Sequence, residues 1–531
     1  MKVMNMKKKI SKTQLLLAAM VALALLLTPA AFAAAPGITG TTFNLVASPS
    51  NISQPDGSFI YSWGYGCDGA PAGFAPAAIA NASCNIMQIP GPTLIITAPA
   101  SGTANVTVIL RNSLPTAAGN TSILFPGFNT TTSGGVPGLL TQEAVPGGTV
   151  TYTLAIPSTA AGTHAYYSGT QGDLQVEMGL YGAIIVLPSK VPADCLGANA
   201  TSIAAKNRLA RSHWGESDFR LAAAAYNHAE ACYDREYLFQ FSEMDPRIHR
   251  EAEEQSTRAC TGCMSVATEP YIPAYYLING RSMPDLMDPN YATQYPHQPY
   301  NGNPHMHPGE LTLLRIIGQG RWQHPFHEHG NHVRILARDG NLILGQNDPN
   351  SLAGPLLFTT TTTPGVAMDG IYYWTGKGLN WDAYGHNPAS GDPLAKLGCT
   401  PDVNGYNTGS PTAINYFEWC QDHNKPLQTA PFGDVAGGGP ATLPDPNILA
   451  NGTWFGGSPY LGPNATVRAV GSTGTTPPSG TIGNSPTDEA GFAFMWHSHN
   501  EREITTNNIF PGGMLMMMLV DSREFVIDES N

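Results

Sequence analysis

Charge is scarce in this chain of 531 residues, since Asp, Glu, Lys and Arg together make up only 12% of it. So low a fraction excludes a highly charged disordered polymer, a coiled coil and a long helical array. Gly and Pro, with 57 and 44 residues, stay below the content of low-complexity disordered chains. After residue 33 no apolar run is long enough to span a membrane. With 42% hydrophobic residues, the composition indicates a turn-rich globular protein that is mostly β.

The first 33 residues have the three parts of a secretory signal peptide. Residues 1–13 hold five lysines and no acid, residues 14–27 are nearly all apolar, and Ala31-Phe32-Ala33 fits a cleavage site. A membrane anchor is the alternative, but the apolar run is short for a span. We therefore expect secretion to the periplasm or the extracellular space, a mature chain from about Ala34, and no membrane span.

Acidic residues outnumber basic ones, and removal of the signal peptide widens the difference. The full chain has a net charge of −13, and the mature chain keeps 21 basic against 39 acidic residues, a net charge of −18. Nucleic acid and anionic lipid surfaces repel such a protein, whereas cations suit it. We expect no nucleic-acid partner, while the sequence leaves open whether the substrate is a small molecule or a metal ion.

Eight cysteines follow the signal peptide, and an even number in an exported chain indicates disulfides. Their closeness in sequence favours four local pairs: Cys67–Cys84, Cys195–Cys232, Cys260–Cys263 and Cys399–Cys420. For the Cys260-Thr-Gly-Cys263 step, a redox-active pair or half of a zinc site remains an alternative.

Short apolar runs separated by turn residues divide the chain into two β regions. Residues 34–190 and 236–531 alternate strand-like segments with Pro-Gly and Gly-Gly steps, which predicts two β-sandwich domains. Residues 191–235 contain few turn residues and predict a partly helical linker. Residues from about 340 to 491 are rich in Gly, Pro, Asn and Thr, and predict a large loop-rich insertion in the second domain.

Six of the 15 histidines fall in two short windows, residues 324–332 and 497–499. Residues i and i+2 of a strand share a face, so His327 with His329, and His497 with His499, are each spaced to bind a metal ion. Neutral imidazole suits copper, zinc, iron and nickel. Ordinary core or surface histidines are the alternative. His305-Met306-His307, between two prolines, is a weaker candidate for an accessory copper site.

Segments along most of the chain resemble the multicopper oxidases, a family built from cupredoxin domains. They are residues 87–94 (MQIPGPTL), Gly162-Thr163, residues 179–182 (GLYG), residues 277–280 (LING) and the two histidine windows. The resemblance implies an all-β fold of two cupredoxin-like Greek-key sandwiches, as in the two-domain branch of the family. It also implies copper as cofactor, oxidoreductase activity and a homo-oligomer, a trimer by analogy.

Departures from the family pattern affect both kinds of copper site. The family's trinuclear centre takes two histidines from each of four motifs, but the first two motifs read Leu124-Phe125-Pro126-Gly127 and Tyr167-Ser168-Gly169 here. At the type 1 site, His324 and Met514 match by position, whereas Ser498 replaces the cysteine and Glu503 the second histidine. We therefore expect neither a complete trinuclear cluster nor a blue copper site. The remaining candidate metal ligands are His324, His327, His329, His497, His499, Glu503 and Met514.

Two functions remain open at this point. The first is an exported relative of the multicopper oxidases that binds one or a few copper or other transition-metal ions and acts as an oxidoreductase without four-copper laccase chemistry. The second is a metal-free cupredoxin scaffold that serves as an envelope or extracellular structural or binding protein.

Overall fold

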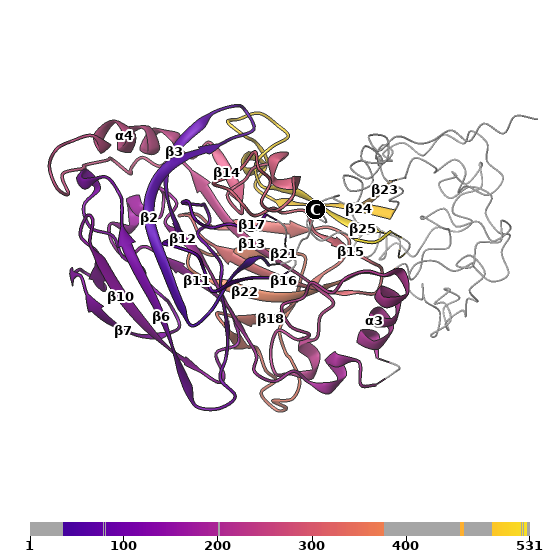
Figure 1. The fold of residues 1–531 in the computed structure, drawn as a ribbon. Helices are drawn as coiled ribbons and strands as arrows, with labels where there is room; N and C mark the ends of the chain where they lie inside the picture. Colours follow the sequence, from indigo (N-terminus) through magenta and orange to yellow (C-terminus); the bar gives the residue numbers. More distant parts are fainter. Residues whose placement is uncertain are drawn as a thin grey trace, which may run out of the picture.

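The computed structural model describes residues 35–375 except 78, 80, 200 and 201, residues 457–460, and residues 491–527 except 522 and 524. Two β-sandwiches lie side by side in it, the first coloured indigo to magenta and the second pink to yellow (Figure 1). The predicted all-β class is confirmed.

The first sandwich consists of two five-stranded sheets, ordered β11-β12-β5-β1-β4 and β3-β2-β6-β10-β7. Strand β10 shows why these segments form sheets: Val150, Tyr152, Leu154 and Ile156 alternate with more exposed residues and face the core. The strands are β1 Gly37–Thr39, β2 Thr42–Ser53, β3 Phe59–Cys67, β4 Gly73–Ala75, β5 Leu94–Thr97, β6 Thr103–Asn112, β7 Asn129–Gly134, β10 Thr149–Pro157, β11 Gly162–Tyr167 and β12 Tyr181–Leu187, with β8 Val136–Pro137 and β9 Gln142–Glu143 forming a separate small pair.

The second sandwich packs a sheet ordered β14-β13-β16-β22-β18-β19, with β20 beside β18, against one ordered β15-β25-β24-β17-β21, with β23 beside β24. Phe326, Trp496 and Met516 belong to the core between them. The strands are β13 Arg235–Met244, β14 Tyr275–Ile278, β15 His305–Met306, β16 Leu311–Gly318, β17 His324–Glu328, β18 Val333–Arg338, β19 Asn341–Leu342, β20 Leu356–Leu357, β21 Thr359–Thr362, β22 Ala367–Tyr373, β23 Gly457–Tyr460, β24 Gly491–Ser498 and β25 Leu515–Asp521.

The structure places a strand of the second sandwich inside the predicted insertion and a helix inside the predicted linker segment. Within the stretch predicted to be loop-rich, β22 lies between β16 and β18 in the middle of a sheet, so the sandwich continues to Tyr373. The Gly, Asp and Thr residues around β22 hid this buried strand from the sequence pattern. Most of the remainder, 376–456 and 461–490, lies outside the described residues. The segment 191–235 contains one α-helix, Ile203–Trp214. Within the described residues the helices are α2 Gly172–Gln175, α3 Ile203–Trp214 and α4 Pro246–Ser256, with short 3-10 helices η1 Thr116–Ala118, η2 Ala193–Leu196, η3 Ala229–Ala231, η4 Asp285–Met287 and η6 Glu501–Ile504.

The two sandwiches share buried contacts that fix their relative position. Helix α4 follows a strand of the second sandwich, yet it covers the first (Figure 1), where Ile248 and Ala252 join the core. Asp369 of β22 accepts hydrogen bonds from the backbone N–H and the hydroxyl of Thr163 on β11, and from the Tyr226 hydroxyl. Buried carboxylates are tolerated only with such partners, so this contact locks the two domains together.

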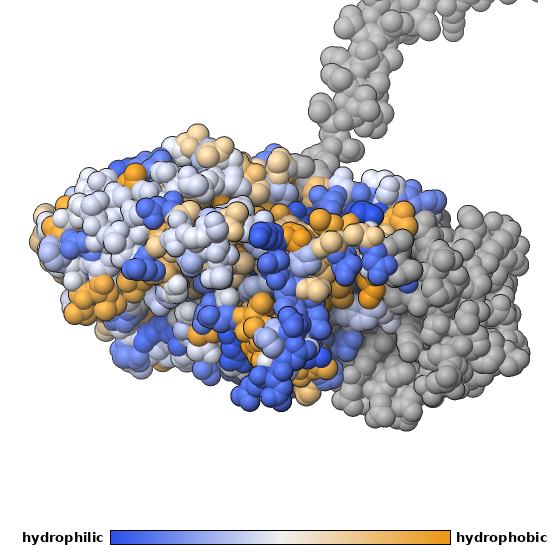
Figure 2. Space-filling view, turned by 90° about the horizontal axis from the view of Figure 1, so that it is seen from below, coloured by the Kyte–Doolittle hydropathy of each residue, from blue (hydrophilic) through white to orange (hydrophobic). Residues whose placement is uncertain are grey.

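Disulfides and surface agree with a folded globular protein. Three of the predicted pairs form, Cys67–Cys84, Cys195–Cys232 and Cys260–Cys263, whereas Cys399 and Cys420 lie outside the described residues. On the face shown in Figure 2, hydrophobic side chains form small patches separated by hydrophilic ones. Within the described ranges, no helix is both long and apolar enough to cross a membrane.

Candidate metal centre

Four histidines come together where β17 and β24 pair. The two strands run antiparallel, and their register places His327 directly opposite His497. His329 follows His327 by two residues, and His499 follows His497 by two residues. The backbone N–H of His499 donates to the carbonyl of Pro325. Because alternate residues share a face, all four imidazoles project from the same side of the sheet. The sequence prediction that the two pairs converge therefore agrees with the geometry.

Most neighbouring rings contact each other edge to face, whereas the rings of His497 and His499 are tilted by 42°. Ring centroids lie 4.8 Å apart for His327 and His329, 4.9 Å for His327 and His499, 5.2 Å for His329 and His497, 5.4 Å for His497 and His499, and 5.6 Å for His327 and His497. The Nε2 atoms of His329 and His497 are 3.3 Å apart. We refer to these four residues as the histidine cluster.

The cluster keeps its central imidazoles neutral. Burial, together with the repulsion expected from three neighbouring histidines, lowers the pKa of His327 to about 4. Burial also lowers the pKa of His497, and the charge of His499 adds to this effect. Neutral imidazole is the form that binds a transition metal.

Hydrogen bonds at Nδ1 orient two of the rings. Nδ1 of His327 lies 2.8 Å from the Thr359 hydroxyl, and Nδ1 of His497 lies 2.7 Å from the carbonyl oxygen of Ser498. Such partners are typical of metal-binding histidines, whose second nitrogen is held by a neighbouring group.

The donor set fits a copper or zinc ion chemically, but the rings would have to turn to bind one. As the side chains lie, no three His, Cys, Asp or Glu residues of the described chain are arranged to hold a metal ion. The edge-to-face contacts explain this, because ring nitrogens that point past one another do not share a centre. The ring centroids of His327 and His497 lie 5.6 Å apart, and metal binding would require their side chains to rotate.

His324, Glu503 and Met514 form a separate group on the opposite, core-facing side of β17. The Nδ1 atom of His324 lies 2.9 Å from a carboxylate oxygen of Glu503, and its Nε2 lies 2.9 Å from a carboxylate oxygen of Glu243 on β13. Burial alone would lower the pKa of His324, but these two carboxylates outweigh it and raise the pKa to about 9. Both ring nitrogens of the resulting imidazolium donate hydrogen bonds, so neither offers a lone pair to a metal ion.

Ser498 and Met514 complete this second group without joining a metal-binding arrangement. The Ser498 hydroxyl donates to Glu503 over 2.5 Å, and the backbone N–H of Met514 donates to the Glu503 carbonyl. Thus the position at which the resemblance puts a type 1 copper ion holds a buried ion triad, Glu243–His324–Glu503. Sequence reasoning missed Glu243, because strand β13 also carries Arg235, Glu236 and Gln240, so its second acidic residue does not stand out.

The remaining predicted positions lie apart from the cluster. His305 and His307 are buried, with ring nitrogens 2.7 Å from Asp521 and Glu216 carboxylates. In the first sandwich, Leu124 and Tyr167 form a backbone bridge. They line a cavity of about 300 Å³ at the positions where the family has its first histidine motifs.

Comparison with known proteins adds a family match. Residues 81–191 match the family model described as multicopper oxidase. No curated protein matches the chain in sequence.

Several solved structures align with the chain. A blue copper oxidase from Nitrosomonas europaea is 15% identical, with a TM-score of 0.43 and coverage of 90% of this chain and 85% of that one. The multicopper oxidase mgLAC is 13% identical, with a TM-score of 0.43 and coverage of 90% and 86%. A copper nitrite reductase from Nitrosomonas europaea is 18% identical, with a TM-score of 0.37 and coverage of 64% and 86%.

The family match falls on the first of the two sandwiches and includes three of the segments that suggested the relationship, residues 87–94, Gly162-Thr163 and residues 179–182. The all-β fold of two sandwiches is the one that the resemblance implies, and residues 81–191 are similar to the multicopper oxidases.

Proposed function

We propose that this protein is an exported, copper-binding relative of the multicopper oxidases whose histidine cluster holds the metal. One observation carries the proposal: the pairing of β17 with β24 brings four imidazoles together on one face of a sheet. The ring centroids of the directly opposed pair, His327 and His497, lie 5.6 Å apart. The signal-peptide pattern of residues 1–33 supports export.

The partners of the other buried histidines support a special role for the cluster. His305, His307 and His324 each have a ring nitrogen 2.7 to 2.9 Å from a carboxylate oxygen. In the cluster, by contrast, the rings lie against one another, and burial together with the neighbouring histidines lowers the pKa of His327 and of His497. Neutral imidazoles suit a bound transition-metal ion better than protonated rings do.

Access and chemistry fit a working site. His499 is 55% exposed, so an ion can reach the cluster from solvent, whereas His327 and His329 lie deeper. Bound copper would supply one-electron redox chemistry. The chain's own contribution is to keep the imidazoles of His327 and His497 neutral and to hold these two rings through Thr359 and the Ser498 carbonyl.

The metal content of the purified protein tests the proposal. After incubation with Cu²⁺ and desalting, we expect about one copper per chain by elemental analysis, and loss of that copper when His497 and His499 are both replaced by alanine. His213→Ala is the matched control, because His213 is exposed on α3, outside the cluster. Unchanged copper in the double variant would contradict the proposal and move the site elsewhere.

The metal-free scaffold remains the second candidate, favoured by the ion triad that occupies the type 1 position. Absence of stoichiometric copper, zinc and iron in wild-type protein purified with each metal would select it.

A further inference from the structure

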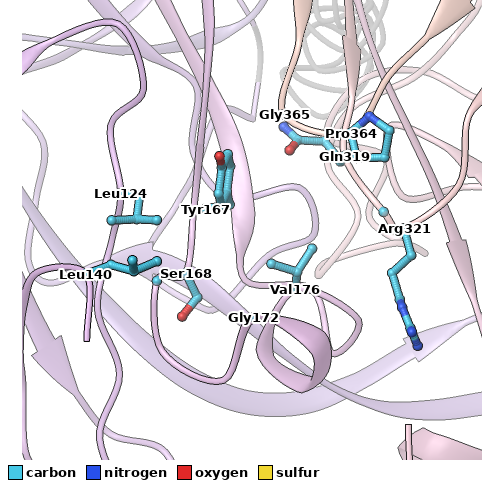
Figure 3. A pocket seen from close by; sticks show the side chains of 12 residues that line it. Leu124, Leu140, Tyr167, Ser168, Gly172, Val176, Gln319, Arg321, Pro364 and Gly365 are labelled. Carbon is cyan, nitrogen blue, oxygen red and sulfur yellow. The ribbon is translucent and has the colours of Figure 1, made fainter. Parts of the chain in front are cut away.

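The cavity between the two sandwiches has an apolar lining that includes Leu124, Leu140 and Val176 (Figure 3). Arg321 is the one charged residue among its described lining residues, and its guanidinium already pairs with Glu269 at 2.6 Å. The cavity therefore offers little that would specify a ligand. A pair of methionines on the sheet of the histidine cluster offers more specific ligand chemistry.

Met495 and Met517 lie directly opposite each other on β24 and β25. The two strands are antiparallel, and their register pairs Met495 with Met517 and, two residues further along β24, His497 with Leu515. Directly opposed residues of an antiparallel pair have Cβ atoms about 5 Å apart. The two thioether groups can therefore approach a common point.

The pair projects from the outer face of the sheet, on the side of the histidine cluster. Met516 and Met518 flank Met517 in sequence and belong to the core of the second sandwich. Because successive side chains of a strand point to opposite faces, Met517 and its partner Met495 point away from that core. His497 follows Met495 by two residues and shares this face. Both outward-pointing methionines are partly exposed.

Methionine is an unusual choice for two opposed, partly exposed strand positions. Such positions favour β-branched and aromatic side chains, which pack against their cross-strand neighbours. The methionine side chain is instead unbranched and flexible, and its sulfur is polarisable. Soft thioether donors select Cu(I), whereas neutral imidazoles also bind Cu²⁺ and Zn²⁺.

We propose that Met495 and Met517 form a thioether site for Cu(I), on the same sheet face as the histidine cluster but separate from it. Both sulfur atoms are neutral ligands, so binding releases no proton, unlike binding to protonated imidazoles. The site lets the chain hold a copper ion in its reduced state. It goes beyond the proposed function, because it needs neither Cu²⁺ nor the histidine cluster.

NMR of the methionine methyl groups with Ag(I) tests the site directly. Ag(I) is a soft monovalent substitute for Cu(I) that air does not oxidise. In a chloride-free titration of the full chain, isotopically labelled at its methionine methyl groups, we expect the Met495 and Met517 signals to move together and to saturate at about one Ag(I) per chain. The signals of the buried Met516 and Met518 should move far less. Cu(I), added without oxygen as its acetonitrile complex, should move the same pair, and Zn²⁺ should not.

Substitutions separate the thioether site from the histidine cluster. Met517→Leu keeps an apolar side chain of similar volume but removes one sulfur, and should weaken the Ag(I) response of Met495 at least about tenfold. Met283→Leu is the matched control, because Met283 is also partly exposed but lies outside β24 and β25. His497→Ala combined with His499→Ala removes half of the cluster and should leave the methionine response unchanged.

Several results would overturn the proposal. They are a Met495 signal that Ag(I) does not move in the wild type, an equal response to Zn²⁺, and an undiminished response in folded Met517→Leu. Met495→Leu, read through Met517, is the reciprocal variant if the first does not fold. Loss of the response in the double histidine variant would assign the Ag(I) to the cluster and also overturn a separate site. A failure of the proposed function differs from all of these, because it would show as absent Cu²⁺ whatever the methionines bind.

Discussion

The Nδ1 atom of His324 donates a 2.9 Å hydrogen bond to Glu503, the residue that stands where the resemblance expects a second histidine ligand. Glu243 binds the other ring nitrogen at the same distance. One buried cation thus lies between two buried carboxylates. This arrangement satisfies every polar atom of the imidazole and fills the position that copper takes in the family pattern.

The ion triad predicts a stability change above neutral pH. The folded-state pKa of His324 is raised to about 9 from an ordinary value of 6.5, so its contribution is fully present below pH 6.5 and is lost as the pH rises through 9. Denaturant unfolding should show a loss on the order of 3 kcal/mol across this range. In Glu503→Gln the loss should be smaller, because one carboxylate partner is gone.

Glu501→Gln is the control for this comparison, because Glu501 is 83% exposed and lies two residues away. A wild-type free energy of unfolding that follows the Glu503→Gln curve at every pH would rule out the triad as its source.

Copper-loaded protein should lack the intense blue absorption of type 1 sites. That band requires a thiolate ligand, and Ser498 stands at the cysteine position, where its hydroxyl donates to Glu503. Ser498→Cys alone should also stay colourless, because both nitrogens of His324 remain hydrogen-bonded to carboxylates. Visible spectra of both proteins with Cu²⁺ provide the check, and a strong blue band in the wild type would show that the fourth motif is misaligned.

The buried carboxyl group of Glu328 should reduce the free energy of unfolding as the pH rises from acid to neutral. Burial raises the pKa of Glu328 from 4.5 to about 8, and its Oε1 accepts from the Thr360 hydroxyl. The folded state therefore keeps a proton that the unfolded state releases between about pH 4.5 and 8, which favours unfolding as the pH increases. Glu328→Gln does not titrate, so its stability relative to wild type should grow over this range, by on the order of 4 kcal/mol. A constant difference in unfolding free energy between the two proteins would contradict the assignment.

The disulfides should differ in how readily a reductant reaches them and in how much each one stabilises the folded protein. Cys67 and Cys84 are buried at 4% exposure, whereas Cys260 lies exposed in a loop after α4. Mild reductant should open Cys260–Cys263 first, as thiol labelling and mass spectrometry can show. Replacing both Cys67 and Cys84 by serine should cost about 3 kcal/mol, and replacing Cys260 and Cys263 should cost much less. Simultaneous labelling of all described cysteines under native conditions would count against this order.

Local patterns allowed much of the fold and half of the site to be predicted. The alternation in β10 identifies a strand with one buried face, and the i, i+2 spacing of His327 and His329 places two rings on one side. The pairing of His327 with His497 was predictable only through the family resemblance, because 170 residues separate them.

Contacts between residues that lie far apart in the chain could not be predicted from the sequence. Glu243 reaches His324 from another sheet, and nothing near either residue specifies that contact. The pairing of Met495 with Met517 likewise depends on how β24 and β25 align in the folded chain. Tertiary packing decides such contacts, and local spacing does not encode them.

Helix α4 has a consequence for how the chain is made. Ile248, Ala252 and Met264 belong to the core of the first sandwich, although they follow β13 of the second. Because these residues are synthesised after all strands of the first sandwich, a nascent chain that stops near residue 235 has every strand of that sandwich but leaves part of its apolar core uncovered. A fragment cut at the apparent domain boundary would therefore expose this surface and aggregate, whereas a fragment extended to about residue 270 would bury it.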